Sequence, residues 1–353
     1  MTAILIVKTG ALGDVLRTTS ILPGLAQRYP GARIVWVTAP AAVDLVRRHP
    51  RVERVIALDP KDPAAARNCA QALAQEGPWQ RVLSLDDEEP LCRLAVALAD
   101  PDAAPGVLSG AYVDRDGARR YTQDVAPWFD MGLLSVHGKA HADRLKVENT
   151  RSHAAIYAAM FGIEMGAPEL PLDPAHSAFA ERFAAGRAAG LPRPWIGLNT
   201  GSGGRWESKK LSVERTVELA AALADARGAG FVLLGGPEEA ERNRAIAAGL
   251  AARGVRHADA GTDNALLDFA AIVDRLDLLI TSDSLALHIA TARRVLVLAF
   301  FAPTSAAEIE LYGRGAKVCS TASDYCSYAK DADTSTLTVE RLLGPALELI
   351  RAR

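Results

Sequence analysis

Residues 4–14 read ILIVKTGALGD, and this stretch sets the expectation for the whole chain. Its apolar start, residues 4–7, is typical of a buried strand, and its two glycines permit a tight turn into the amphipathic stretch at residues 14–28. Apolar runs of similar length recur at residues 34–37, 55–58 and 82–85. Strands that alternate with helices in this way predict a parallel sheet covered by helices on both faces.

The same alternation starts again near Trp195. We expect strands at residues 195–198, 231–234, 278–281 and 295–300, and helices at residues 213–227, 238–253, 264–275 and 285–293. Between the two halves, residues 167–174 contain three prolines, which is typical of a stiff linker. A final helix is expected at residues 339–352, interrupted at Gly344 and Pro345, and Pro23 is expected to kink or end the first helix early.

The predicted fold class is therefore α/β, with two doubly wound, Rossmann-like domains. We place the first domain at residues 1–170 and the second at residues 175–338, and one expectation for the helix at residues 339–353 is that it packs back on the first domain. Ligands of such sheets bind beyond the carboxyl ends of the strands. The two domains are expected to face a cleft, with the informative residues in loops that follow strands.

Composition narrows the class of partner. The 353 residues are 49% hydrophobic and 23% charged, as is usual for a folded protein of about two domains. Lysine and arginine together number 40, and aspartate and glutamate number 42, which gives a net charge of −2. Because there is no overall basic field and only 6% of residues are aromatic, no nucleic-acid partner is expected.

The cysteines and the N-terminal stretch indicate in which cellular compartment the protein is expected. The four cysteines are scattered and none belongs to a CxxC pair, which predicts a reduced, cytoplasmic protein. The first apolar run is too short for a signal peptide, and no run of about 18 apolar residues predicts a membrane span. We therefore expect a cytoplasmic protein with at most peripheral membrane contact.

The first loop after a strand, residues 9–14, combines a glycine turn with an acid at a helix start. Its glycine spacing does not match the GxGxxG dinucleotide fingerprint. Asp14 has two readings: it caps the helix, where the dipole favours an acid, or it acts as a general base.

The loop at residues 199–211 holds three glycines, hydroxyl groups at Thr200 and Ser202, and Lys209. Backbone N–H groups, hydroxyls and an ammonium group of this kind bind phosphates. The Gly-Lys-Ser/Thr order of a Walker A motif is missing, so a long solvated turn is the alternative.

Two further loops follow strands in the second half. At residues 234–239, a proline and Glu238 and Glu239 make an ordinary helix start, or one acid accepts ribose hydroxyls. At residues 281–288, Asp283 or Ser284 is a helix cap, or the hydroxyls bind phosphate and Asp283 accepts sugar hydroxyls. His288 is then either a satisfied buried histidine or part of the same site.

Other polar clusters carry less information. The acids at residues 86–89 are interpreted as a solvated loop, and the spacing of Cys319 and Cys326 does not match a zinc site, so no metal site is predicted. The cations at residues 141–151 are an exposed helix face or the site of an anionic acceptor.

Taken together, the loops resemble those of the family-9 glycosyltransferases, which include the ADP-heptose:lipopolysaccharide heptosyltransferases. The opening motif of the family is similar to residues 4–15, and its donor-site motifs are similar to residues 201–211, 235–239 and 281–288. Residues 302–304 and 311–313 are a further similar stretch. The resemblance covers nearly the whole chain and is weakest at residues 60–135.

The resemblance implies the GT-B fold, with an acceptor bound by the first domain and a nucleotide-sugar donor bound by the second. It implies an inverting transfer of a heptose from ADP-heptose to a hydroxyl of an anionic glycan or glycolipid, the lipopolysaccharide inner core. No cofactor or metal is implied. An acceptor anchored in lipid would place the enzyme at the inner face of the inner membrane.

Roles are carried over residue by residue. Asp14 matches the catalytic base and Lys209 the diphosphate-binding lysine, and Glu238 stands one position from the preferred ribose acid, Glu239. The implied donor-binding residues are Thr200, Gly201, Ser202, Lys209, Glu239, Asp283, Ser284 and His288. The residues assigned to the acceptor are Gly13, Arg17, His141, Arg144, Lys146 and Arg151.

The chain departs from the family pattern where many members have Asp-Thr-Gly. Here Asp283-Ser284-Leu285 keeps the hydroxyl and loses the glycine. The alternatives are a GT-B enzyme with another nucleotide sugar or acceptor, including a nucleotide-sugar epimerase, and a non-catalytic nucleotide-sugar binding protein. Retention of Asp14, Lys209 and Asp283 together argues against the last of these.

Overall fold

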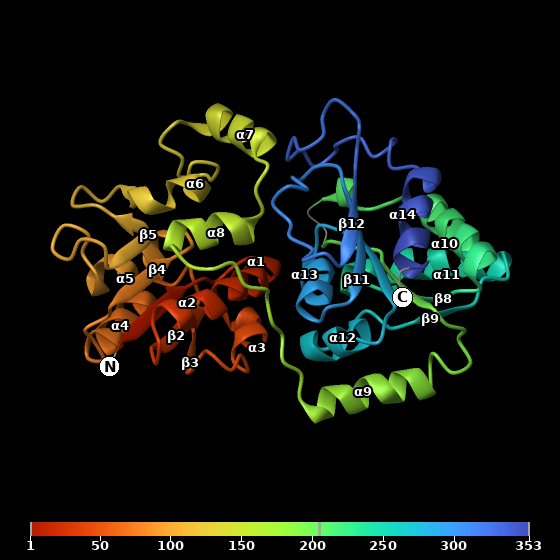
Figure 1. Cartoon of the computed structure of the whole chain (residues 1–353), viewed down its shortest axis with the longest axis horizontal. Helices are drawn as coiled ribbons and strands as arrows, with labels where there is room; N and C mark the ends of the chain where they lie inside the picture. The colour runs from red at the N-terminus through yellow and green to blue at the C-terminus, as the bar shows by residue number, and fades with distance from the viewer. Residues whose placement is uncertain (1, 204–205, 352–353) are drawn as a thin grey trace. The chain divides into compact units, whose positions relative to one another are not determined.

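The structure is a computed structural model that describes residues 2–203 and 206–351. The chain divides into two compact units, Met1–Pro171 and Leu172–Arg353, and the boundary falls inside the proline-rich stretch. Each unit contains one sheet with helices packed against it (Figure 1). In the part of the chain that is described, no helix is both long and apolar enough to cross a bilayer.

The first unit is built on a six-stranded sheet in the order β3-β2-β1-β4-β5-β6. Its first five strands are parallel, and β6 runs antiparallel to β5. The strands are β1 (Ala3–Val7), β2 (Arg33–Thr38), β3 (Arg54–Ala57), β4 (Arg81–Ser84), β5 (Leu108–Val113) and β6 (Arg119–Tyr121).

Helices cover both faces of this sheet. Leu5 and Val7 share one apolar cluster with side chains of α4 and α5, whereas Ile4 and Ile6 alternate to the other face and are also fully buried. The helices are α1 (Leu12–Thr18), α2 (Leu22–Arg28), α3 (Val43–Val46), α4 (Pro63–Ala74), α5 (Glu89–Leu98), α6 (Ala126–Phe129), α7 (Lys139–Glu148) and α8 (His153–Phe161).

The helix predicted at residues 14–28 is divided in the structure. A 3-10 turn, Thr19–Ile21, separates α1 from α2, and Pro23 lies at the start of α2. Proline is tolerated there because its missing N–H would have no partner inside the helix. The first helix therefore ends before Pro23, and the proline lies in the first turn of a second helix.

The second unit has a six-stranded, fully parallel sheet in the order β12-β11-β10-β7-β8-β9. Its strands are β7 (Trp195–Asn199), β8 (Gly230–Leu234), β9 (His257–Asp259), β10 (Leu278–Ser282), β11 (Leu296–Phe301) and β12 (Gly315–Cys319). Its helices are α9 (Pro174–Ala185), α10 (Val213–Arg227), α11 (Ala240–Ala252), α12 (Leu266–Val273), α13 (Leu285–Ala292) and α14 (Val339–Arg351). Both sheets thus confirm the predicted doubly wound α/β class.

Helix α14 packs into the second unit. Leu342 and Ala346 are fully buried in the same cluster as residues of α10 and of the central strands. The apolar side of this helix therefore packs against the core of its own unit. The predicted interruption at Gly344 and Pro345 is wrong, because α14 is continuous with Pro345 inside it, and buried residues on both sides of the proline hold the helix in place. Ala352 and Arg353, included in the predicted helix, lie outside the described residues.

Candidate active site

The turn between β1 and α1 is held by the carboxylate of Asp86, which follows β4. Thr9 donates to this carboxylate from its hydroxyl over 2.8 Å and also from its backbone N–H, and the N–H of Gly10 donates over 3.2 Å. Lys8 forms an ion pair with the same carboxylate. Because β1 and β4 are parallel neighbours, their carboxyl ends bring these residues together. The interpretation of residues 86–89 as a solvated acidic loop is therefore wrong for Asp86, whose side chain is only 10% exposed.

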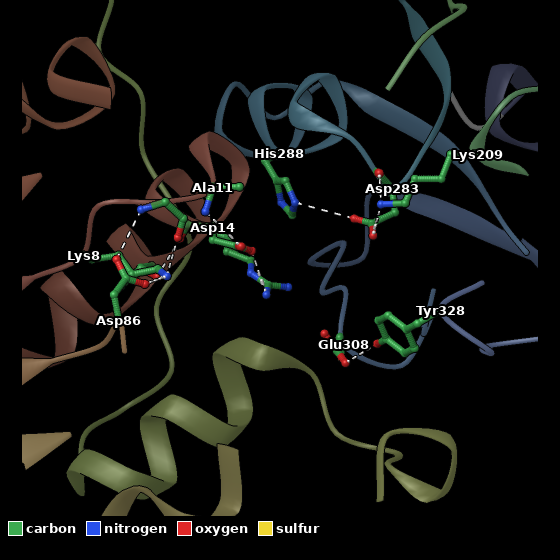
Figure 2. Close-up of polar contacts among 12 residues, drawn as sticks. Lys8, Ala11, Asp14, Asp86, Lys209, Asp283, His288, Glu308 and Tyr328 are labelled. Carbon is green, nitrogen blue, oxygen red and sulfur yellow. Dashed lines mark hydrogen bonds and ion pairs between the residues drawn. The ribbon is translucent and has the colours of Figure 1, made fainter. Parts of the chain in front are cut away.

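Asp14 lies in the first turn of α1, directly after this turn (Figure 2). One carboxylate oxygen accepts a hydrogen bond from the backbone N–H of Ala11 over 3.3 Å, and the other pairs with Arg17 over 2.8 Å. The side chain of Asp14 is still 36% exposed. The carboxylate thus caps its helix and remains within reach of a ligand, so the capping role and the proton-accepting role are compatible.

An aromatic cluster lies behind Asp14 and Arg17. The Arg17 guanidinium stands 5.3 Å from the ring centre of Trp128, and this ring meets His153 and Tyr157 edge-on. Burial raises the pKa of Tyr157 above its usual range, so this phenol stays protonated. Stacking of Arg17 on an aromatic face restricts the cation to one position beside Asp14.

The other cations that the sequence assigns to an acceptor lie on α7 and at the start of α8. His141 and Arg144 contact each other at 2.9 Å, and Lys146 pairs with Asp143 at 3.3 Å. Arg151 donates to the backbone carbonyl of Ala155. Each of these cations is anchored locally along this segment, whereas Gly13 and Arg17 belong to α1 together with Asp14.

In the second unit, Lys209 and Asp283 meet at the carboxyl ends of the strands (Figure 2). The Lys209 ammonium donates to a carboxylate oxygen of Asp283 over 3.0 Å and to its backbone carbonyl over 2.9 Å. The other carboxylate oxygen lies 3.8 Å from Nε2 of His288, on α13. Three predicted donor-binding residues, Lys209, Asp283 and the buried His288, therefore form one contiguous polar group.

Asn199, at the end of β7, was missed by the sequence analysis. Its amide lies within hydrogen-bonding distance of the Gly201 carbonyl (2.7 Å), the Thr281 hydroxyl (3.0 Å) and the Ser284 hydroxyl (3.2 Å). The amide thereby joins the end of β7 to the end of β10 and to the start of α13. The signal was a polar residue at the last position of an otherwise apolar strand.

Glu239 is buried against the loop that follows β7. One of its carboxylate oxygens accepts a hydrogen bond from the N–H of Gly236 over 2.9 Å, and the ammonium of Lys210 lies 3.9 Å from the other. Glu238, its neighbour, is exposed. Of the two acids, Glu239 is thus the one held at the edge of the sheet beside Gly201.

Two of the predicted hydroxyl ligands behave differently from expectation. The hydroxyl of Thr200 donates into the fold, to Asn243 over 2.5 Å and to the carbonyl of Leu234 over 3.1 Å, and the residue is buried. Ser202 lies in the loop itself and contacts the carbonyl of Trp206 at 3.4 Å. Thr200 therefore anchors the loop with its hydroxyl turned away from a ligand. Gly204 and Arg205, in the same predicted loop, lie outside the described residues.

No group of three or more His, Cys, Asp or Glu side chains with the geometry of a metal site occurs among the described residues. Cys319 and Cys326 are not disulfide-bonded.

Comparison with known proteins points to one family. A family model described as glycosyltransferase family 9 (heptosyltransferase) matches residues 117–339. The curated lipopolysaccharide heptosyltransferase 1 of Pseudomonas aeruginosa is 36% identical over 81 residues, which are 22% of this chain and 21% of that protein. The chain thus aligns with about a fifth of the length of this relative.

Solved structures show the same fold over nearly the whole chain. A family-9 glycosyl transferase from Veillonella parvula has a TM-score of 0.80 at 20% identity and covers 100% of this chain and 98% of its own. ADP-heptose lipopolysaccharide heptosyltransferase II of E. coli has a TM-score of 0.66 at 19% identity, covering 100% and 99%. E. coli heptosyltransferase WaaC with ADP-2-deoxy-2-fluoro heptose has a TM-score of 0.57 at 21% identity, covering 98% and 99%. The predicted GT-B fold is confirmed.

Proposed function

Because the chain belongs to glycosyltransferase family 9 and is a glycosyltransferase, we propose that it transfers a heptose from ADP-heptose to a hydroxyl of the lipopolysaccharide inner core, with inversion. The observation that carries the proposal is the Lys209–Asp283 pair, which places a cation and an acid together at the carboxyl ends of the second sheet. The names of the relatives support the choice of substrates, since they include lipopolysaccharide heptosyltransferase 1 and a heptosyltransferase with an ADP-heptose analogue.

On the donor side, Lys209 binds the diphosphate. In the structure its ammonium is paired with Asp283, so an incoming diphosphate replaces a carboxylate as the partner of this cation. Asp283 is then released to accept hydroxyls of the transferred sugar, with Ser284 and His288 beside it. Glu239 accepts the ribose hydroxyls, while Gly201 and Ser202 supply close backbone approach and a hydroxyl.

On the acceptor side, Asp14 is the general base. Its carboxylate takes the proton of the acceptor hydroxyl as that oxygen attacks the anomeric carbon of the donor. Gly13 leaves space next to the carboxylate, and Arg17, Arg144, Lys146 and Arg151, together with the imidazole of His141, bind anionic groups of the acceptor.

The bond changes balance without a further reactant. A bond forms between the acceptor oxygen and the anomeric carbon, and the bond from that carbon to the diphosphate oxygen breaks with its electron pair. ADP leaves with the added negative charge, and Lys209 stabilises that charge where it develops. A well-placed donor of this kind contributes about 3 kcal/mol to the transition state.

The test of the base is Asp14→Asn, with Asp44→Asn as the matched control. Asp44 forms the same kind of pair on α3, with Arg47 three residues later, and is similarly exposed. We expect Asp14→Asn to abolish transfer while the dissociation constant for ADP stays within about twofold, and Asp44→Asn to leave both unchanged. Turnover that survives in Asp14→Asn would contradict the role of Asp14.

The donor is tested by thermal shift with ADP, UDP, GDP and ADP-heptose. A ligand at 100 times its dissociation constant stabilises the folded protein by about 2.7 kcal/mol. We expect a response to ADP and ADP-heptose. A response to UDP or GDP alone would replace the proposed donor, and consumption of a nucleotide sugar without an acceptor would favour an epimerase.

We also propose that the enzyme is cytoplasmic and works at the inner face of the membrane. Leu133, Val136 and Val147 are 87%, 66% and 59% exposed, and they flank the cations of α7. Exposed apolar side chains beside cations are typical of contact with an anionic bilayer. The protein should sediment together with phosphatidylglycerol vesicles. The Leu133→Asp/Val136→Asp variant should stay in the supernatant. Equal sedimentation of both proteins would refute the contact.

A further inference from the structure

Lys8 and Asp86 form a buried ion pair next to Asp14, and the proposed reaction assigns no role to either residue. Their side chains are only 8% and 10% exposed. A buried ion pair of this kind is weak evidence for stability, since its desolvation cost offsets much of the attraction. Its position in the fold indicates a different use.

The pair binds both the carbonyl and the N–H groups of the turn that leads to Asp14. Lys8 donates to the backbone carbonyl of Gly10 over 2.5 Å, while Asp86 accepts from the N–H groups of Thr9 and Gly10. The next N–H along the chain, that of Ala11, is the one that donates to Asp14. The two buried charges and Asp14 therefore hold three consecutive peptide groups of one turn (Figure 2).

The pair also contributes to the electric field at Asp14. Burial alone would lower the pKa of Lys8, but the attraction of Asp86 and then of Asp14 outweighs burial and raises that pKa above its usual range. The charged ammonium form of Lys8 is therefore favoured in the folded protein. The coupling is mutual, because the same attraction that favours the ammonium favours the ionised form of Asp14.

Other ionisable groups also lie near Asp14. Arg17 pairs with it on α1, and Tyr157 and His153 lie on α8 behind Arg17. Asp44, on the neighbouring helix α3, is paired with Arg47. Of the cations near Asp14, Arg17 is on the same helix, and Lys8 is the one that enters from the sheet.

We propose that Lys8 and Asp86 are positioning residues for Asp14: they fix the turn that presents its carboxylate, and the Lys8 charge sets its proton affinity. This inference rests on the proposed role of Asp14 as the base. In addition, the ion pair on the sheet adjusts the proton affinity of the base. Substitutions at Lys8 and Asp86 should therefore shift the acid limb of the pH profile in opposite directions.

The test compares pH profiles of kcat/KM for Lys8→Met and Asp86→Asn. Loss of the Lys8 charge removes support for the carboxylate, so the acid limb should move to higher pH. Loss of the Asp86 charge leaves Lys8 uncompensated, so the acid limb should move to lower pH. In both variants kcat at the optimum should fall by about tenfold to a hundredfold, because the base is displaced. The dissociation constant for ADP should stay within about twofold.

Two further proteins separate this effect from loss of stability. The double variant Lys8→Met/Asp86→Leu replaces the buried pair with apolar side chains of similar size, a change that is often tolerated by the fold. It should remain folded and lose kcat. In the control Glu76→Gln, the altered ion pair with Arg33 lies at the other end of the same sheet, and transfer should be unchanged.

The outcomes distinguish the inference from the function on which it rests. If Asp14→Asn abolishes transfer but Lys8→Met and Asp86→Asn keep kcat and the wild-type acid limb, the positioning role is refuted and the base remains. Shifts of the same sign in both single variants also refute it. If Asp14→Asn is active, the proposed base is wrong, whatever the Lys8 and Asp86 variants show.

Discussion

Gly201 lies directly against the carboxyl group of Glu239. A Cβ atom at position 201 would come within 2.0 Å of the carboxyl carbon of Glu239 and 2.2 Å of one of its oxygens. The loop after β7 and the turn after β8 are therefore fitted to each other, and the absence of a side chain at Gly201 lets Glu239 reach the edge of the sheet. The proposed ribose-binding acid depends on this glycine.

Gly201→Ala should weaken donor binding. The new methyl group displaces the Glu239 carboxylate or the loop that carries Ser202, so we expect the dissociation constant for ADP to rise by about tenfold or more. Isothermal titration of ADP measures this change. Gly344→Ala is the matched control, because a Cβ at that position of α14 meets no atom within 4 Å. Unchanged ADP affinity in Gly201→Ala would show that Glu239 does not contact the nucleotide.

Lys209→Met should slow the transfer, because the leaving diphosphate loses the cation that stabilises its negative charge. Removal of the ammonium costs the transition state about 3 kcal/mol, which corresponds to a fall in kcat of about a hundredfold or more. Steady-state kinetics with saturating donor measure the effect, and Lys330→Met, an exposed lysine of the same unit, is the control. A variant with normal kcat and only a higher KM would assign Lys209 to ground-state binding alone.

Tyr328→Phe should loosen the segment that follows β11. The Tyr328 hydroxyl donates to Glu308 over 2.8 Å (Figure 2), and the Tyr328 N–H donates to the carbonyl of Pro303. Loss of a hydrogen bond to a charged group costs about 1.5–3 kcal/mol. Urea unfolding should detect this loss at pH 7.

The alkaline behaviour of the same pair gives a second readout. Burial and the Glu308 charge raise the pKa of Tyr328. The folded protein therefore keeps a proton that the unfolded chain releases above pH 10, and the free energy of unfolding falls as pH rises through that range. The Tyr328→Phe variant should lack this component. An identical alkaline slope in the wild type and the variant would contradict it.

Acid should destabilise the first unit through His49. Desolvation lowers the pKa of the buried His49 imidazole from 6.5 to about 4, although Glu169 opposes the change. Between these values the unfolded chain binds a proton that the folded protein does not. The stabilisation is therefore complete above pH 6.5 and is lost as pH falls towards 4, by about 3 kcal/mol in total.

His49→Asn isolates this effect. The variant cannot gain the proton, so its free energy of unfolding should decline less steeply between pH 6.5 and 4 than that of the wild type. Chemical denaturation at several pH values gives both slopes, and His257→Asn, a half-buried histidine of the second unit, serves as the control. Parallel slopes in the wild type and His49→Asn would refute the assignment.

The central strands could be predicted because their interior positions are apolar. The observed β1, β2, β7 and β8 differ from their predicted ranges by one residue at most at each end. Strands β5, β6 and β9 could not, since β6 and β9 have three residues each, and β5 contains Ser109 and Gly110. Such strands are set by the neighbour with which they pair rather than by their own pattern.

The candidate site was predictable to the extent that its residues follow predicted strands. The sequence pointed to Asp14, Lys209 and Asp283, and the structure pairs the last two directly. It did not reveal Asn199, whose amide joins segments far apart in the chain, or the burial of Asp86. A run of acids has the same composition whether its members face water or a buried lysine, so only the packing of β4 beside β1 separates the two cases.

The second unit cannot complete its core until helix α14 has been synthesised. A ribosome that has reached residue 338 has already made every loop proposed to bind the donor, but not Leu342 and Ala346, which complete the core beneath them. The first unit comes from one earlier, continuous stretch of chain. During translation, the half that carries Asp14 therefore folds first, and a nascent chain stalled before α14 holds the half proposed to bind the acceptor without a folded half for the donor.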